Sequence, residues 1–436
     1  MGLTVFGWSW EAAQEQWLGV ALALLLLSIM WVMLTYGVRQ TVYCLNRLYA
    51  THRYPYQGIR RASWPMVTVF VAAHNEEAVI ADCIEALLQT DYPQQRLKVV
   101  IVNDRSSDST RLIVDRYAAC YPGRIEPFHR SSGKPGKAAA LKDAMSLAKG
   151  DIALIFDADY TPGKTLLREL VAPFFNPEVG AVMGRVVPRN AGSNLLTRIL
   201  DLERSAGYQV DQQARMSLRT VPQYGGTVGG IRLSAANFVG GWNDDVLAED
   251  TDITFRLLIA GWKTVYINHA ACLEEVPEEW SVRMRQIHRW ATGHNQVLLR
   301  YWHPLLVSRH VATRERVDGL MLLGIFLMQP LLLMGWAVAI AIYYLNASQT
   351  LTLLVPVALF VVYGTIASFS AFMQIGFAVL VDGHRRRIRL LPLQLLSFIT
   401  NLSVISSAFI ASLHSLVSKR ELVWKKTVRY RKQVSS

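Results

Sequence analysis

Two closely spaced carboxylates are the first feature of the sequence that could do chemistry. Asp157 and Asp159 follow directly on the apolar run 152–156. Alternating carboxylates at the end of such a run suit a hard divalent cation that takes further oxygen ligands from a diphosphate. We therefore expect Mg²⁺ or Mn²⁺ as a cofactor. The alternative is that these residues cap a turn or a following helix, which Thr161 and Pro162 would permit.

A second acidic pair, Glu249 and Asp250, follows a glycine-dense section and precedes the helix-like run 253–260. Either carboxylate could act as a general base that takes the proton of an acceptor hydroxyl as this hydroxyl attacks a sugar's anomeric carbon. Acidic residues are also favoured at helix N-termini for structural reasons. Taken alone, the pair is better explained as a helix cap.

Three further polar residues could bind a nucleotide. Asp104 and Glu76 could accept hydrogen bonds from a nucleoside, although both could equally cap helices. Lys137 lies in the Gly-Lys-Pro-Gly-Lys segment 133–137, where a cation beside flexible backbone could hold a pyrophosphate. An exposed lysine is otherwise simply solvated.

The segment 286–290 reads Gln-Ile-His-Arg-Trp and lies just ahead of an apolar region. The Trp290 indole could stack on a sugar ring, and the Arg289 guanidinium could grip phosphate. Trp and Arg also favour membrane surfaces, so an interfacial anchor is the alternative. His288 is better explained as a bystander, because no nucleophile or metal-spaced histidine accompanies it.

The elements that must position these residues follow an alternating pattern from residue 65 onward. Apolar runs alternate with helix-like stretches, which predicts βαβ units and a mostly parallel sheet covered by helices. The strands are expected at 67–72, 99–102 and 152–156, with helices at 76–88 and 110–119. Polar clusters follow each strand, at 74–76, 103–104 and 157–159. Because ligands bind beyond the carboxyl ends of such strands, these clusters should share one crevice.

The composition indicates a membrane protein, since 52% of the residues are hydrophobic and only 18% are charged. Four uncharged stretches are long enough to cross a bilayer, which takes roughly 20 residues. They lie at 17–38, 319–342, 351–381 and 390–417. The block between the first two is polar enough to form a soluble domain.

Basic residues predict the orientation of the chain. No Lys or Arg precedes Arg39, so the positive-inside rule places residues 1–16 outside the cell, the linker 39–64 in the cytoplasm and the first span as a retained anchor. If all four stretches crossed the membrane, the basic tail 418–436, with Trp424 and Arg429, would lie outside. We therefore expect 390–417 to be partly interfacial or re-entrant, which keeps the tail in the cytoplasm near the catalytic domain.

The net charge of +12 could indicate nucleic acid, but the basic residues concentrate beside the membrane segments, at 385–389 and 419–432. Anionic lipid headgroups are the simpler partner, and we expect no nucleic acid. The four cysteines form no close pair of a metal-binding or redox kind, which suits a reducing cytoplasm.

Taken in order, these motifs resemble those of the processive family 2 glycosyltransferases of bacterial membranes, such as the cellulose, hyaluronan, chitin-oligosaccharide and poly-N-acetylglucosamine synthases. The resemblance covers the chain from about residue 65 to its end and is closest, in size and layout, to the poly-N-acetylglucosamine synthases. The residues that carry it are Asn75-Glu76, Asp104, Gly136-Lys137, Asp157-Ala158-Asp159, Glu249-Asp250 and Gln286-x-x-Arg289-Trp290.

The resemblance implies a GT-A fold, with a Rossmann-like, mostly parallel sheet over 65–280, interfacial helices over 281–312 and an α-helical transmembrane region. It also implies a role for each matched residue. Asp250 would be the catalytic base, with Glu249 beside it. Trp290 and Gly229 would bind the acceptor. The donor UDP-sugar and its metal would be held by Ala72, Asn75, Glu76, Asp104, Lys137, Asp157, Asp159, Gln286 and Arg289.

The activity implied is inverting, processive transfer of N-acetylglucosamine or glucose from UDP to a β-linked polysaccharide, which the enzyme passes across the inner membrane. Its partners would be the UDP-sugar, a growing glycan or a lipid acceptor, the bilayer and, for export, accessory subunits. Two alternatives stay open: a glycolipid synthase that adds one hexose to a membrane lipid, and a catalytically silent scaffold. Lys142, where many relatives carry Asn, and Gly229-Gly230 leave the sugar undecided.

Overall fold

The computed structural model describes residues 10–50, 56–59, 63–345 and 369–418. Parts of four expected regions lie outside these residues: 1–9 of the N-terminal region, 51–55 and 60–62 of the linker, 351–368 of the third apolar stretch and 419–436 of the basic tail, with Trp424 and Arg429.

Four parallel strands form the first half of the sheet, in the order β3-β2-β1-β4. The apolar, largely β-branched residues of β1, β2 and β4 are buried on both faces, as parallel strands between helices require. The register sets Ala72 opposite both Val102 and Asp157, so the polar residues at the strand ends share one edge. The strands are β1 Val67–Ala73, β2 Leu97–Asp104, β3 Ile125–Arg130 and β4 Ile152–Asp157.

The second half of the sheet is mixed. Strand β7 runs antiparallel to β4 and β6, while β6 and β8 are parallel to each other and β5 closes the edge. The described residues thus form one eight-stranded sheet in the order β3-β2-β1-β4-β7-β6-β8-β5, which confirms the GT-A type of architecture. These strands are β5 Thr161–Pro162, β6 Val179–Pro188, β7 Gly229–Arg232 and β8 Lys263–Glu274.

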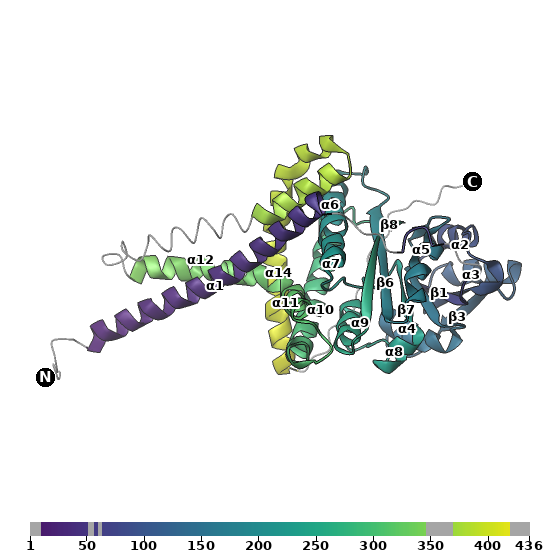
Figure 1. Cartoon of the computed structure of the whole chain (residues 1–436), viewed down its shortest axis with the longest axis horizontal. Coiled ribbons are helices and arrows are strands. Elements are labelled where there is room, and N and C mark those ends of the chain that lie inside the picture. Colours follow the sequence, from purple (N-terminus) through teal and green to yellow (C-terminus); the bar gives the residue numbers. More distant parts are fainter. Residues whose placement is uncertain (1–9, 51–55, 60–62, 346–368, 419–436) are drawn as a thin grey trace.

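Helices cover both faces of the sheet (Figure 1). The side chains of alternate strand residues point to opposite faces and pack into two separate hydrophobic cores. Val69 packs under α2 and α5, whereas its neighbour Phe70 packs under α4 and α9. The covering helices are α2 Ile80–Leu88, α3 Thr110–Cys120, α4 Lys137–Ala144, α5 Leu166–Val171, α8 Leu233–Phe238 and α9 Glu249–Ile259, with short 3₁₀ turns η1 Gln94–Arg96, η2 Met145–Leu147 and η3 Ala172–Phe175.

A helical layer lies between this domain and the membrane segments (Figure 1). One part is a continuous helix in which α6 passes through a π-helical stretch, η4, into α7. Asn194 begins it by accepting the Thr197 N–H at 3.0 Å, an N-cap that ends the preceding loop. The elements are α6 Leu195–Ser205, η4 Ala206–Gln212, α7 Gln213–Leu218, α10 Trp280–Val307, α11 Thr313–Leu323 and η5 Ile325–Leu327.

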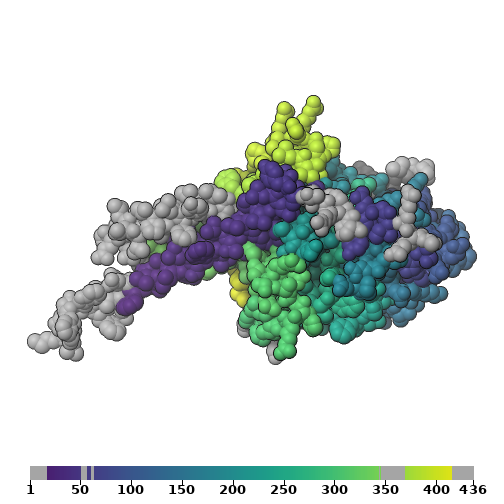
Figure 2. Space-filling model, in the orientation of Figure 1, coloured from purple at the N-terminus to yellow at the C-terminus, as the bar shows by residue number. Residues whose placement is uncertain are grey.

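Two long apolar helices project from the body as an arm, α1 Trp10–Tyr49 and α12 Met328–Leu345 (Figures 1 and 2). They pack together through Leu26, Met30 and Val338. The side chains on their outer surfaces are apolar and exposed, Trp17 by 73% for example. Among the described residues, three helices are long and apolar enough to cross a membrane: Trp17–Tyr49, Ile325–Ile342 and Arg385–His414.

The boundaries of these helices differ from the expected spans for a physical reason. α1 continues through Arg39 and Tyr43, both buried, so its last third belongs to the catalytic body rather than to a linker. Residues 319–323 belong to α11, where Leu322 and Leu323 join a core with α10, and the second candidate span begins only at Ile325.

The last helix, α14 Gln394–Ser418, crosses the base of the arm instead of running along it (Figure 1). It follows the short apolar helix Phe369–Val381 and the 3₁₀ segment η6 Arg385–Leu393. Ile405 and Ala408 of α14 pack on Ile287 and Ala291 of α10. A helix that crosses two candidate membrane spans at their base is arranged as an interfacial segment would be, so 390–417 stays a prediction.

Candidate active site

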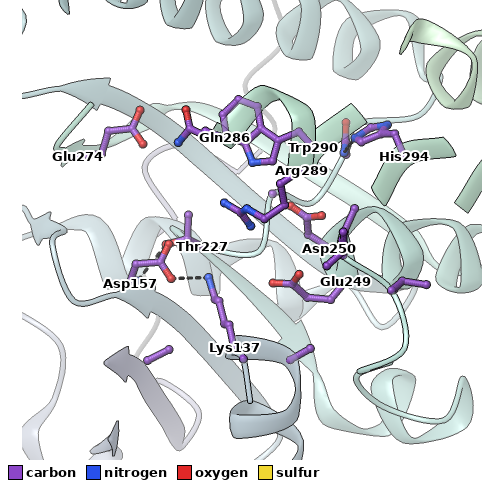
Figure 3. Close-up of a pocket in the computed structure, with 18 of the residues that line it drawn as sticks. Lys137, Asp157, Thr227, Glu249, Asp250, Glu274, Gln286, Arg289, Trp290 and His294 are labelled. Carbon is purple, nitrogen blue, oxygen red and sulfur yellow. Dashed lines mark hydrogen bonds and ion pairs between the residues drawn. The ribbon is translucent and has the colours of Figure 1, made fainter. Parts of the chain in front are cut away.

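A cavity of about 680 Å³ opens at the carboxyl ends of β1, β2 and β4 and extends under α9 and α10 to η5. It collects nearly all the side chains predicted from the sequence (Figure 3). Those lining it are Ala72, Glu76, Asp104, Lys137, Asp157, Asp159, Glu249, Asp250, Gln286, Arg289 and Trp290.

Two predicted residues lie elsewhere. Asn75, in a left-handed conformation with φ 55°, accepts the Ser107 N–H at 2.7 Å and so ties the loop after β1 to the loop after β2. Gly229 is buried in β7, where a Cβ atom would lie 2.4 Å from the Val182 carbonyl oxygen. Gly229 therefore allows close strand packing, and the prediction that it binds the acceptor is withdrawn.

Asp104 ends β2 and lines the cavity at the end formed by the strands. Its carboxylate accepts hydrogen bonds from Arg130 Nη1 at 2.7 Å, Arg105 Nε at 2.9 Å and the Gly136 N–H at 3.1 Å. Burial alone would raise the pKa of Asp104, but these donors outweigh it and the pKa is lowered. Asp104 is thus a fixed anion that shapes this end of the cavity, and its bond to Gly136 positions the start of α4.

Lys137, the first residue of α4, forms an ion pair with Asp157 inside the cavity (Figure 3). Burial favours the uncharged amine, yet the charges of Asp157 and then Glu249 outweigh burial and raise the pKa of Lys137. The Asp157 N–H also donates to Thr227 Oγ1 at 3.1 Å, which fixes the end of β4. The cavity therefore holds a permanent cation where a diphosphate could bind.

Asp157 and Asp159 are the residues that could hold a divalent metal. Asp159 is buried, and its Oδ2 accepts the Glu275 N–H at 3.3 Å. Within the described residues, no cluster of three or more His, Cys, Asp or Glu side chains is arranged to hold a metal ion. Two carboxylates fit Mg²⁺ or Mn²⁺ when diphosphate oxygens and water complete the coordination, so this donor set fits a metal that binds together with the nucleotide.

Glu249 and Asp250 open α9 and face Lys137 and Arg289 (Figure 3). Burial and the neighbouring Asp250 charge raise the pKa of Glu249 to about 7. Burial likewise raises the pKa of Asp250, although the Thr251 N–H and the Lys137 charge oppose the rise. A carboxylate with a raised pKa is a stronger base, which suits proton abstraction near neutral pH.

The predicted motif on α10 forms the roof of the cavity. Gln286 Oε1 accepts a hydrogen bond from Arg283 Nη1 at 2.9 Å. The guanidinium carbons of Arg204 and Arg283 lie 5.2 and 5.3 Å from the centre of the Trp290 ring, within cation–π range. Trp290 is thereby held in place at the cavity wall, and Arg289 extends into the space between Asp157 and Asp250 (Figure 3).

The far end of the cavity is apolar and consists of residues that the sequence reading did not single out. Leu322 lies in the last turn of α11, and Ile325 and Phe326 belong to η5, where the second candidate span begins. His294 of α10 lines the cavity beside them. The sequence does contain a signal for His294 as a cavity residue. It lies four residues after Trp290, and residues at this spacing share one face of a helix.

Comparison with known proteins identifies the family of this chain. The family model "Glycosyltransferase like family 2" matches residues 65–293. A probable glycosyltransferase of Bacillus subtilis (strain 168), YdaM, is 31% identical over 428 residues, which is 96% of this chain and all of that protein. A beta-monoglucosyldiacylglycerol synthase of Trichormus variabilis is 34% identical over 281 residues, which is 64% of this chain and 59% of that enzyme.

One solved structure shares the fold. The mannosyltransferase PcManGT of Pyrobaculum calidifontis, in complex with GDP-Man and Mn²⁺, superposes with a TM-score of 0.57 at 21% identity over 84% of this chain and 98% of that one. The expected fold and enzyme class are confirmed, while the processive subgroup stays a prediction. The chain belongs to glycosyltransferase family 2 and is a glycosyltransferase with a GT-A fold.

Proposed function

We propose that this enzyme is a glycolipid synthase that transfers one hexose from a UDP-sugar to the hydroxyl of a membrane diacylglycerol. The observation that carries the proposal is the shape of the cavity, which runs from the strand ends to η5 at the base of α12. A lipid whose acyl chains stay among the apolar residues Leu322, Ile325 and Phe326 could present its hydroxyl toward Asp250.

The relatives support the same acceptor class. The Trichormus enzyme is named for the synthesis of a glucosyldiacylglycerol. The matched segment covers 59% of that enzyme's length. We therefore use its substrate as a guide to the substrate of this chain and do not assign its full activity to this chain. Glucose from UDP-glucose is accordingly our first candidate for the donor, with UDP-N-acetylglucosamine second.

The described membrane helices also favour a single transfer over the processive synthesis expected from the resemblance. A polysaccharide that crosses the bilayer needs a polar path through it. Among the described residues, the α1–α12 contact is formed by the apolar side chains of Leu26, Met30 and Val338. A glycolipid needs no such path, because its acceptor and its product both stay in the membrane.

The proposed mechanism is a direct displacement. The acceptor oxygen attacks the anomeric carbon, the bond from that carbon to UDP breaks, and the hydroxyl proton passes to Asp250. An attack opposite the leaving group inverts the anomeric centre. Lys137 and Arg289 offset the negative charge that develops on the leaving UDP, and a general base contributes about 10²- to 10⁴-fold.

A divalent cation held by Asp157 and Asp159 would supply further charge neutralisation at the diphosphate. Glu76, Asp104 and Ala72 would bind the nucleoside, and Gln286 with Arg289 would close the donor site. We place the catalytic domain on the cytoplasmic side of the inner membrane, with α1 and the 325–342 helix as spans and α14 along the surface.

The experiment is a transfer assay with the purified full chain in lipid nanodiscs. Radiolabelled UDP-glucose, UDP-galactose and UDP-N-acetylglucosamine are supplied in turn, with Mg²⁺ or Mn²⁺, with and without diacylglycerol. A single-sugar lipid that forms only with diacylglycerol is the expected product. A long glycan formed without diacylglycerol would instead support the processive synthase. Asp250→Asn should abolish transfer while leaving UDP binding intact.

A further inference from the structure

We propose that Gln223, Thr251 and His294 form a hydrogen-bonded unit that positions Asp250 and leaves its Oδ2 as the oxygen that takes the acceptor proton. The inference rests on the proposed role of Asp250 as the base. The three residues come from the loop before β7, from α9 and from α10, so the unit joins three separate elements at one carboxylate.

The Thr251 contacts distinguish the two oxygens of Asp250. The Oδ1 atom accepts the Thr251 N–H at 2.6 Å and lies 3.3 Å from Thr251 Oγ1. On the other side, Gly226 has a φ of 72°, and a Cβ atom there would lie 3.1 Å from the Asp250 Cβ and 3.5 Å from Oδ2. The side chain is therefore confined between the α9 backbone and Gly226, with Oδ1 engaged and Oδ2 available to substrate.

The chemistry of the donors assigns the direction of each hydrogen bond around Thr251 Oγ1. Gln223 Nε2 lies 2.8 Å away and can only donate, while the Asp250 carboxylate can only accept. The proposal assigns the single hydroxyl proton to Asp250 Oδ1. His294 then carries its proton on Nε2 and donates it, at 3.0 Å, to the remaining lone pair of Thr251 Oγ1.

His294 is suited to this task because it stays neutral. Burial and then the Arg215 charge lower its pKa to about 4, so at neutral pH the ring carries a single proton. Its ring packs edge-on against Phe326, with the centroids 4.9 Å apart. One nitrogen therefore holds the hydroxyl of Thr251 while the ring itself forms part of the apolar end of the cavity.

Gln223 is held in turn by the π-helical stretch η4. Its N–H donates to Gln212 Oε1 at 3.0 Å, and its carbonyl accepts from Gln212 Nε2 at 2.8 Å. π-helical turns inside helices are frequent at functional sites. The side chain of Gln223 thus reaches Thr251 from a backbone that is fixed on both sides.

The proposal predicts an effect on turnover rather than on donor binding. A base displaced by about 1 Å can lose roughly 100-fold in rate. Loss of the hydroxyl donor should also raise the pKa of Asp250, because a hydrogen bond to the charged form favours ionisation. The other charged or titratable groups that face Asp250 are Lys137, Glu249, Arg289, Tyr208 and Tyr224, and all of them stay in place in the variants.

The test measures kcat and KM from pH 5 to 9 by UDP release, using the full chain in nanodiscs. Thr251→Val and His294→Phe should each lower kcat about 10- to 100-fold, with KM for the UDP-sugar within about twofold, and Thr251→Val should move the acid limb to higher pH. The double variant should be no worse than the more severe single variant. His294→Gln, which keeps a donor near the Nε2 position, should restore most of kcat.

Thr292→Val and His303→Phe are the matched controls. The Thr292 hydroxyl bonds the His288 carbonyl on α10 at 2.8 Å, and His303 lies further along the same helix. Wild-type kcat in His294→Phe, or fully additive losses in the double variant, would overturn the proposal. If thermal melting shows that Thr251→Val is not folded, Gln223→Leu is the deciding variant. It removes a hydrogen-bond donor to the Thr251 hydroxyl and should also lower kcat.

The result is separable from the proposed function. UDP release reports transfer to any acceptor, so a glycan product instead of a glycolipid would correct the acceptor class and leave the comparison of variants valid. Asp250→Asn, measured in parallel, tests the base itself. Full activity in Asp250→Asn would refute the base assignment, whereas an inactive Asp250→Asn beside a fully active His294→Phe would refute only the positioning unit.

Discussion

Arg39 of the long apolar helix α1 donates a hydrogen bond from Nε to Asp318 Oδ1 of α11 at 2.8 Å, and both side chains are buried. Asp318 Oδ2 also accepts the Val221 N–H at 3.2 Å, at the start of the loop that carries Gln223. The C-terminal part of α1 is therefore built into the catalytic body and does not merely tether it.

Asp318→Asn should destabilise the protein by about 1.5–3 kcal/mol, because it removes the charged hydrogen-bond acceptor of buried Arg39 and leaves Asp211, 3.8 Å from Arg39 Nη1, as the remaining counter-charge. The double variant Arg39→Met/Asp318→Asn should recover part of this loss. Thermal unfolding in detergent measures both. Lys263→Met, which breaks an exposed pair with Glu178, is the control and should change stability by less than about 1 kcal/mol. Equal melting temperatures for Asp318→Asn and wild type would contradict the structural role of α1.

Lys137→Met should weaken donor binding about tenfold, which corresponds to about 1.4 kcal/mol. The reason is that the variant removes the cation paired with Asp157 and leaves the carboxylates of the cavity to repel a diphosphate. Calorimetric titration with UDP measures the effect. Lys142→Met, on the same helix but in an exposed pair with Asp244, should bind UDP like wild type. Equal losses in both variants would indicate a general charge effect.

The contribution of Glu249 to the stability of the enzyme should fall as the pH rises from about 4.5 to about 7, whereas that of His294, whose pKa is lowered from 6.5 to about 4, should rise over much of this range. A carboxyl whose pKa is raised on folding binds its proton more tightly in the folded state, so it stabilises the fold at low pH and loses this contribution as it ionises. Glu249, whose pKa is raised from 4.5 to about 7, is such a group. Glu249→Gln should therefore show a smaller drop in melting temperature between pH 5 and pH 8 than wild type. The same drop in both would argue against a protonated Glu249 in the cavity.

Gly229→Ala should destabilise the sheet by about 1–3 kcal/mol through overpacking, because its Cβ would meet the Val182 carbonyl oxygen. The specific activity of the folded fraction should stay near wild type, since Gly229 does not line the cavity. Gly163→Ala, at a site with nothing within 4 Å, is the matched control. A stable Gly229→Ala variant with lost activity would restore Gly229 as an acceptor residue.

A depth profile should distinguish α14 from the spanning helices. Spin labels at Leu395, Ile399 and Ile410, all exposed on α14, should report one shallow depth in a bilayer, because the helix is predicted to lie along the surface. Labels at Trp17, Leu24 and Trp31 of α1 should instead report graded depths. Power-saturation EPR with oxygen and a nickel chelate measures both series. A graded profile along α14 would mean that it crosses the membrane.

The order of strands and polar strand ends predicted much of the site. Ala72 and Asp157 meet at one sheet edge because parallel register aligns the carboxyl ends, a relationship that alternating βαβ segments already imply. The roles of single residues were less predictable. Gly229 lies outside the cavity because it pairs closely with the neighbouring strand at Val182. Asn75 lies outside it because its side chain contacts the loop at Ser107. Both contacts depend on the tertiary fold.

Contacts between distant segments explain what the sequence pattern missed. Thr251 and His294 lie 43 positions apart, and their hydrogen bond depends on how α10 packs over α9. The length of α1 was misjudged for a similar reason. Arg39 was read as the start of a cytoplasmic linker because it is the first basic residue, whereas its partner Asp318 lets the helix continue inside the protein.

The crossing of α14 at the base of the arm has a consequence for where the product would accumulate. Under the proposed topology, the apolar mouth of the cavity faces a single leaflet, so each turnover would draw its acceptor from that leaflet and return the glycolipid to it. The rate would then follow the mole fraction of acceptor in the membrane rather than its bulk concentration. The two leaflets would become unequal in composition until a separate translocating protein moved the lipid across.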